Sequence, residues 1–396
     1  MPFEPSILMA GLDWPALPQQ LINGLMFGAI YALIALGYTM VYGVLRLINF
    51  AHGEVFMIGA YVALFLSWQM GFYQSPGGAA PAYATSALPI ILMLVLSMVV
   101  CAGIGIAIER FAYRPMRNQP RIASLITAIG VSLLLQYGGA LVLPVSPPRS
   151  IREEVNPYVG QASVDLIKPS AQQLSALDSA TKLDKEMATK LADQVKREGV
   201  SSEFDLSAEG QKVRNARFDA ADALRKAQED AAKSRYTLAV PKGQLIMFIT
   251  TVVLMMILRH LVLFTPVGRQ MRAVAHDFDS AALMGINVDK IITITFVIGS
   301  ALAGAGGMMC ATFLGTSITT FLGVEWGIKA FVAAVLGGIG NIPGAVLGGL
   351  LIGLAENITV WAGFSQYQRA IAFVVLIAVL LFKPGGILGS AKVEKV

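Results

Sequence analysis

Charged side chains are scarce in this sequence, at 14% of 396 residues, whereas a soluble domain usually has about a quarter. Hydrophobic residues make up 55% of the chain. Apolar runs recur that are long enough to cross roughly 30 Å of hydrocarbon as helices. This balance excludes an ordinary soluble domain. It predicts an all-α protein, a polytopic bundle of transmembrane helices.

Cysteine and histidine are also rare, which argues against a disulfide framework or a metal site. Cys101 and Cys310 lie inside apolar segments, where a thiol packs as a small apolar side chain. The three histidines, His52, His260 and His276, are scattered and share no ligand spacing. We therefore expect no disulfide and no metal ligand in this chain.

Motifs of soluble enzymes are missing as well. The sequence has no G-x-x-x-x-G-K-[ST] phosphate loop, no H-E-x-x-H, no Cys-x-x-Cys and no plausible nucleophilic triad. We therefore predict that the chain is not an enzyme and holds no cofactor of its own. If it moves a solute uphill, the energy must come from an ion gradient or from another chain.

Eight or nine spans are predicted, and the two shortest are expected to be broken or re-entrant. The predicted spans are 20–42, 51–68, 88–109, 122–143, 243–264, 291–314, 327–340, 342–361 and 368–383, of which 51–68 and 327–340 are the short ones. The loop 110–121 has four Arg and no acidic residue, which places it in the cytoplasm. The N-terminus is then outside and the C-terminus inside.

A hydrophilic insertion at 146–242 separates a first membrane half, 1–145, from a second, 243–396. The insertion holds 16 Lys and Arg and 15 Asp and Glu, more than half of all charged residues. Its composition favours helices, and Ser170 with Gln173 resembles a capping box. We predict an extracytoplasmic helical hairpin. A solvated hairpin without a specific role, a docking surface for an external partner, and partial disorder all stay open.

Coupling to an ion gradient needs carboxylates inside the membrane, and three glutamates qualify. Glu325 and Lys329 are four residues apart, so they are predicted to pair with each other. Glu356 is predicted to reach water near the outer end of its span, and Glu54 is deeper. Nothing here resembles a chain of proton relays.

Coupling to another chain has a clearer candidate in the cytoplasmic loop 265–290. The segment from Thr265 to Asn287 predicts a short amphipathic helix that ends at a glycine and could dock into a groove on a soluble partner. An interfacial helix that rests on the headgroups is the alternative. Met271, Val274, Phe278 and Ala282 form its predicted apolar face. The candidate contact residues are Arg269, Arg272, Ala275, Asp277, Ala281, Ala282, Leu283 and Gly285.

Each membrane half also contains one interruption, a pattern that points to the translocation path of a transporter. The candidates are Asn49, His52, Gly53 and Glu54 in the first half and Gly337, Gly338, Gly340, Asn341, Pro343 and Gly344 in the second. Two interpretations of Asn49, His52 and Glu54 stay open. They form either a hydrogen-bonded knot around a broken helix, which we favour, or part of the substrate path. Other Gly-x-x-x-Gly pairs, such as Gly24 and Gly28, predict close helix packing.

Several motifs in this chain occur together in one family of permeases. They are Asn23-Gly24, Tyr31–Gly43, Ile48–Glu54, Ile108–Pro115, Gly268–Asn287, Thr295–Gly299, Ala334–Gly340 and Pro384–Gly389. Through them the chain closely resembles the LivH-type permeases of branched-chain amino acid ABC importers. The insertion departs from the family, whose typical members have a much shorter loop there.

The resemblance implies a place in a larger bacterial inner-membrane complex. It implies a second, LivM-like permease subunit, two cytoplasmic ATPases that bind ATP and Mg, and an external binding protein that delivers leucine, isoleucine or valine. The segment Arg272–Gly285 would be the coupling helix that meets an ATPase. Permeases for urea and short amides share the pattern, and an ion-coupled carrier is the rival from another class.

Overall fold

The protein is described from a computed structural model, which covers residues 14–72, 87–117, 119–145, 147, 161–167, 170–200, 204, 207–233, 236–314 and 317–389. The chain separates into two compact units. One comprises residues 1–161 and 240–396, and the other comprises residues 162–239.

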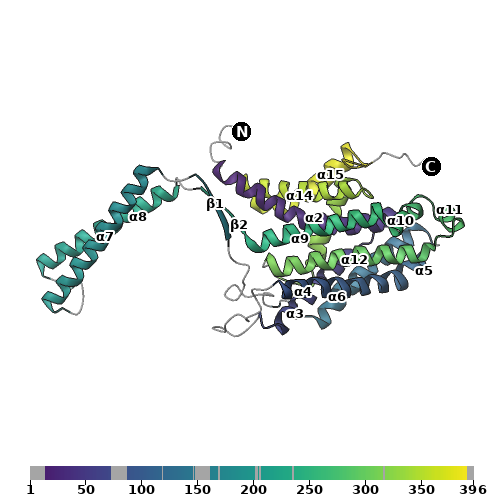
Figure 1. Ribbon diagram of the computed structural model, residues 1–396, viewed down its shortest axis with the longest axis horizontal. Coiled ribbons are helices and arrows are strands. Elements are labelled where there is room, and N and C mark those ends of the chain that lie inside the picture. The colour runs from purple at the N-terminus through teal and green to yellow at the C-terminus, as the bar shows by residue number, and fades with distance from the viewer. Residues whose placement is uncertain are drawn as a thin grey trace, which may run out of the picture. The chain divides into compact units, whose positions relative to one another are not determined.

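The larger unit is a bundle of α-helices (Figure 1). Its long helices are α2 (Leu17–Leu45), α3 (His52–Gln69), α4 (Leu88–Ile108), α6 (Arg121–Val142), α9 (Lys242–Phe264), α12 (Val288–Phe313), α13 (Leu322–Gly337), α14 (Ile342–Trp361) and α15 (Gln368–Phe382). Shorter elements are a π-helical turn (Glu109–Tyr113), α5 (Arg114–Met116), α10 (Pro266–His276) and α11 (Phe278–Leu283), with 3-10 turns at Trp14–Ala16 and Ser365–Tyr367.

Seven helical segments of the described chain are long and apolar enough to cross a membrane. They are 14–45, 88–116, 122–142, 242–264, 288–313, 342–361 and 365–382. The helices α3 and α13 are not among them, and they correspond to the two short segments predicted to be broken or re-entrant. The fold is therefore the predicted polytopic helical bundle.

The core of the bundle is built around α2, which is almost entirely buried and packs against α14, α12 and α13. A helix that is apolar on all sides can be buried on all sides, and α2 has that composition. The helix α12 packs against α3 and α4. In contrast, α6 and α15 are mostly exposed and carry apolar surfaces suited to lipid. The inner helices thus contain the breaks and the buried charges described below.

The predicted close packing through Gly-x-x-x-Gly is confirmed between α2 and α14. A Cβ added at Gly28 would lie 2.8 Å from the Cα of Leu350, and one at Gly24 would lie 2.9 Å from the carbonyl oxygen of Gly353. Because no larger side chain fits, the two backbones approach closely, as small-residue faces allow in membranes. This contact holds α14 against the central helix.

The smaller unit contains a pair of helices, and two paired strands connect it to the rest of the chain. The strands are β1 (Gln161–Ile167) and β2 (Tyr236–Pro241), and the helices are α7 (Ala171–Glu198) and α8 (Ala208–Lys233), which pack against each other. The capping box predicted at Ser170 and Gln173 is present at the start of α7. Near the other end of α7, hydrogen bonds from Ser207 lower the pKa of Glu198.

Candidate translocation and coupling sites

The first interruption begins where α2 ends. Arg46 takes a left-handed conformation, with φ of 55°, and the chain turns back into the bundle. The ring Nε2 of His52, the first residue of α3, lies 3.2 Å from the carbonyl oxygen of Ile34. Ile34 is eleven residues before the end of α2, or roughly 16 Å along a helix. The helix α3 therefore starts inside the bundle and not at its end.

The polar side chains at this break contact different helices. Tyr113, from the π-helical turn, donates a hydrogen bond to Asn49 Oδ1 at 3.1 Å. The ring of His52 packs on Tyr38, with centroids 4.6 Å apart. Ser132 of α6 donates to Glu54 Oε1 at 3.3 Å. Asn49, His52 and Glu54 are all buried, and their contacts favour a hydrogen-bonded knot over a lining of the substrate path.

Gly53 brings the starts of α3 and α13 into backbone contact. A Cβ added at Gly53 would lie 3.1 Å from the Cα of Gly327, and it would also clash with the backbone of Gly323. No side chain larger than hydrogen fits between the two helices there. The first interruption is thus packed directly on the helix that leads into the second.

The second interruption lies between α13 and α14. Gly338 and Gly340 have positive φ angles of 103° and 92°, a conformation that favours glycine. The side chain of Asn341 caps α14 by accepting the N–H of Gly344 at 3.1 Å. Pro343 occupies the first turn of α14, where no N–H is needed, and Gly344 packs against the backbone of Gly337.

The C-terminal segment satisfies backbone groups that this break leaves free. The N–H of Ile387 donates to the carbonyl of Leu336 at 2.8 Å, and that of Leu388 donates to Gly337 at 3.1 Å. The side-chain amide of Asn341 donates to the carbonyl of Leu388 at 2.8 Å. Irregular backbone is tolerated inside a membrane when it is buried in protein, and this segment supplies the cover.

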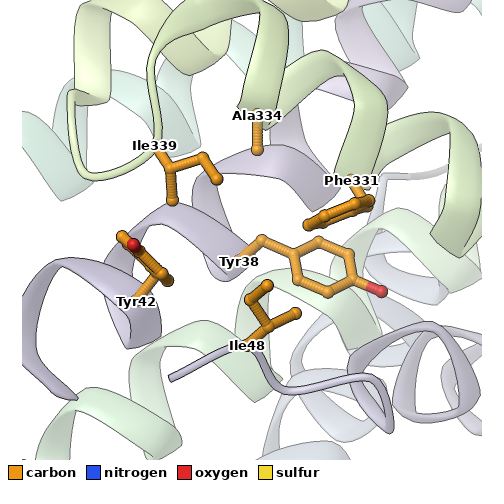
Figure 2. Close-up of a pocket in the computed structure, with 6 residues that line it drawn as sticks. All are labelled: Tyr38, Tyr42, Ile48, Phe331, Ala334 and Ile339. Atoms are coloured by element: carbon orange, nitrogen blue, oxygen red, sulfur yellow. The ribbon is translucent and has the colours of Figure 1, made fainter. Parts of the chain in front are cut away.

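A small apolar pocket lies between the two interruptions (Figure 2). It is lined by Tyr38, Tyr42, Ile48, Phe331, Ala334 and Ile339. Ile48 belongs to the first break and Ile339 to the second, and the rings of Tyr38 and Phe331 are 6.0 Å apart. The space between these side chains is about the size of one water molecule, and its surface is almost entirely apolar.

The charged residues inside the bundle do not pair as predicted. Lys329 Nζ lies 3.0 Å from Glu356 Oε1 and donates to the hydroxyl of Tyr31 at 3.2 Å. The Tyr31 hydroxyl donates to Glu356 Oε2 at 2.8 Å. Glu325 instead contacts Arg369 of α15 at 3.3 Å. The predicted pair of Glu325 and Lys329 is therefore wrong.

The expectation that Glu356 could reach water is also wrong, because its side chain is only 1% exposed. A buried carboxylate needs an opposite charge more than an exposed one does, so Lys329 neutralises Glu356 and not Glu325. Sequence reasoning missed this cluster because its members lie on α2, α13 and α14, far apart in the chain. The one available signal was a lysine inside an apolar segment, which must find a carboxylate.

The segment predicted as one amphipathic helix forms two. The helix α10 is capped by Thr265, and α11 is capped by Asp277, whose Oδ1 accepts the N–H of Ser280 at 2.6 Å. This hydrogen bond lowers the pKa of Asp277. An aspartate that caps a new helix interrupts the old one, which sequence periodicity did not reveal. Gly285 ends the segment with a positive φ of 81°.

The break at Asp277 also splits the predicted apolar face. Met271 and Val274 are buried against the bundle, whereas Phe278 and Ala282 are exposed. Among the other candidate contact residues, Ala281 is buried, Ala275 is half-buried, and Arg269 and Leu283 are exposed. The guanidinium of Arg272 donates to the carbonyl of Val262 at the end of α9, so it holds the corner between α9 and α10.

An exposed apolar tip remains at the end of α11. Leu283 is 88% exposed and Met284 is 84% exposed. Two adjacent large apolar side chains with this exposure, outside the spanning helices α9 and α12, make this tip a candidate contact with another protein. Sequence reasoning included Leu283 among the candidates but missed Met284, which lies outside the periodic apolar face.

Ion pairs connect this segment to the first interruption. Asp289, at the start of α12, pairs with Arg114 and Arg117, and Arg117 also pairs with Glu109 of the π-helical turn. Thr293 of α12 donates to Glu109 Oε2 at 3.0 Å. The same turn carries Tyr113, the partner of Asn49. Sequence reasoning used these arginines only to orient the loop and missed their partners on α12.

A bundle of apolar helices with two breaks, a charge pair in its interior and an exposed helical segment between two spans is the architecture of a polytopic membrane transport protein. The chain belongs to the family described as the permease component of branched-chain amino acid transport systems, whose model matches residues 20–380.

Three relatives show how far the likeness extends. The high-affinity branched-chain amino acid transport system permease protein LivH of Salmonella typhimurium is 34% identical over 381 residues, 96% of this chain and 97% of the relative. LivH of Escherichia coli is 35% identical and BraD of Pseudomonas aeruginosa is 36% identical over the same shares. No solved structure matches the chain significantly. Membership in this family implies a transport system with further subunits.

Proposed function

We propose that this protein is a permease subunit of an ABC importer that moves leucine, isoleucine and valine into the cytoplasm. The observation that carries the proposal is the identity of 34–36% over nearly the whole length of relatives named as branched-chain amino acid permeases. In this proposal the chain itself hydrolyses nothing. Two ATPase subunits bind ATP and Mg, a LivM-like subunit completes the channel, and an external binding protein supplies the substrate at the bacterial inner membrane.

The exposed tip of α11 supports the coupling part of this proposal. Leu283 and Met284 project beyond the bundle, whereas Met271 and Val274 anchor α10 to it. An anchored helix with an exposed apolar tip suits a groove on a soluble ATPase. Asp289 follows directly in the chain and is tied by its arginine partners to the first interruption. A motion of the tip would therefore reach Asn49 through the π-helical turn.

The apolar pocket supports the path for the substrate. It lies between the two interruptions and is lined by aliphatic and aromatic side chains, and it would have to widen to admit leucine, isoleucine or valine. The knot at Asn49, His52 and Glu54 would fix the helices beside this path in place, and these residues would not contact the substrate.

Uptake of labelled leucine and labelled urea, side by side, tests the proposal in cells that lack the gene and then regain it. We expect gene-dependent leucine uptake that survives an uncoupler while ATP is maintained. Uptake of urea alone would keep the mechanism and overturn the substrate. Leucine uptake that collapses with the ion gradient, at constant ATP, would identify an ion-coupled carrier and contradict the ABC assignment.

A further inference from the structure

Of the two charged partners Lys329 and Glu356, Lys329 is the more exposed in the described part of the chain. The Lys329 side chain is 12% exposed, whereas that of Glu356 is 1% exposed. The ammonium group has three N–H donors, of which one bonds to Tyr31 and one faces Glu356. Within the described ranges, no partner is recorded for the third. One N–H of Lys329 is therefore available to a further acceptor.

The surface beside Lys329 is one face of the first turns of α13. Phe321, Val324 and Ile328 are exposed at spacings of three and four residues, which place them on one side of the helix. Glu325 lies on the same side with its side chain 41% exposed, and its partner Arg369 is 81% exposed. An ion pair this exposed is weak, so Glu325 can exchange its partner at little cost.

We infer that this face of α13 binds the head group of a branched-chain α-amino acid, an inference that rests on the proposed function. Lys329 binds the carboxylate, Glu325 binds the ammonium group, and the alkyl chain packs on Val324 and Ile328. The side chains at positions 325 and 329 start about 5–6 Å apart, a span that the two charges of one amino acid can bridge. Glu356 and Tyr31 are positioning residues that hold Lys329 in place.

The charged head group distinguishes a branched-chain amino acid from urea, the neutral alternative substrate. An α-amino acid carries an anionic and a cationic group on one carbon, and both lose water on entering the membrane. A pair of protein groups with opposite charges replaces that water, as charge-assisted hydrogen bonds do in general. A neutral amide such as urea needs neither group. A structural ion pair, in contrast, would stabilise the bundle and be indifferent to what is transported.

The first test replaces Glu325, whose exposed side chain can be changed without disturbing the core of the bundle. In membranes that contain the full complex, Glu325→Gln should lower leucine uptake at sub-saturating leucine-loaded binding protein by about tenfold, the effect of one lost hydrogen bond to a charged group. Arg369→Gln is the matched control, because it removes the same ion pair and leaves Glu325. We expect uptake in the control to stay near wild type. Equal losses in both variants, or no loss in Glu325→Gln, would overturn the inference.

The second test neutralises the buried pair. The double variant Lys329→Gln with Glu356→Gln leaves no unpaired charge, so a purely structural pair should be replaceable with uptake retained. We expect assembly and ATP hydrolysis to persist while leucine uptake is lost, and Lys329→Arg to keep part of it. Retained leucine uptake in the double variant would overturn the binding site on α13 and leave the proposed function standing. A wild-type complex that takes up urea and not leucine would overturn the proposed function as well.

Discussion

The hydrogen bonds and burial of Glu54 favour a structural role for this residue over contact with the substrate. One carboxylate oxygen accepts a hydrogen bond from Ser132, and the other lies against α13 without a hydrogen-bond partner in the described part of the chain. With 1% exposure, the side chain does not face an open path. Its position fits a residue that holds α3, α6 and α13 together.

Glu54→Gln should therefore reduce the amount of assembled protein and leave uptake per assembled complex unchanged. The new amide N–H has no acceptor among the described contacts of Glu54, and a buried N–H that stays unsatisfied costs about 1–3 kcal/mol. Quantitative detection of the complex in membranes, alongside leucine uptake, measures both effects. Normal assembly combined with lost uptake would contradict this role and return Glu54 to the substrate path.

Gly285→Val should uncouple ATP hydrolysis from uptake. A β-branched residue at φ of 81° costs about 1–2 kcal/mol locally, so the turn after α11 should change shape and move Leu283 and Met284. We expect normal amounts of protein in the membrane, continued ATP hydrolysis, and uptake per ATP reduced at least several-fold. Gly103→Val is the control, because a Cβ at Gly103 meets nothing within 4 Å.

At the scale of helices, length and hydropathy predicted most spans correctly, because a membrane-spanning helix must be apolar over a set length. The prediction failed where a local side chain competed with the periodic pattern. Asp277 caps α11 and divides the loop helix into α10 and α11. Met271, Val274, Phe278 and Ala282 have the spacing of one helix face in the sequence. The cap at Asp277 starts a second helix, so the first two residues lie on α10 and the last two on α11.

Gly28→Val should weaken the contact of α2 with α14. A Cβ there already lies 2.8 Å from the Cα of Leu350 and 2.9 Å from the carbonyl oxygen of Gly349, both backbone atoms that cannot move aside. Overpacking of this kind costs about 1–3 kcal/mol. Thermal unfolding of the purified complex should show a lower midpoint than wild type, with Gly130→Val, an open position on α6, unchanged. Equal midpoints for all three proteins would show that α14 is held by other contacts.

At the scale of the whole molecule, the insertion is a compact unit of its own. Its helices pack on each other and bury few side chains, among them Ala180, Leu191, Ala220 and Ala231. The insertion therefore has a small core of its own.

Deleting residues 170–235 should therefore leave leucine uptake close to wild type, as expected for a solvated hairpin without a specific role. The membrane unit keeps both interruptions, the pocket and the coupling segment. Uptake measured over a range of binding-protein concentrations provides the check. A higher concentration needed for half-maximal uptake, with ATP hydrolysis intact, would instead identify the hairpin as a docking surface.

The sequence by itself determined the class of protein, the apolar spans, the positions of the two interruptions and the small-residue faces that allow close packing, but not that α2 packs on α14. Each of these depends on composition or on spacing within one segment, such as the glycines at 24 and 28. Only the tertiary structure decided which carboxylate Lys329 neutralises, that Asp289 binds the arginines beside the π-helical turn, and that Leu388 covers the second break. These pairings join residues far apart in the chain. A buried charge or free carbonyl demands a partner, but only the packing of the helices selects which one.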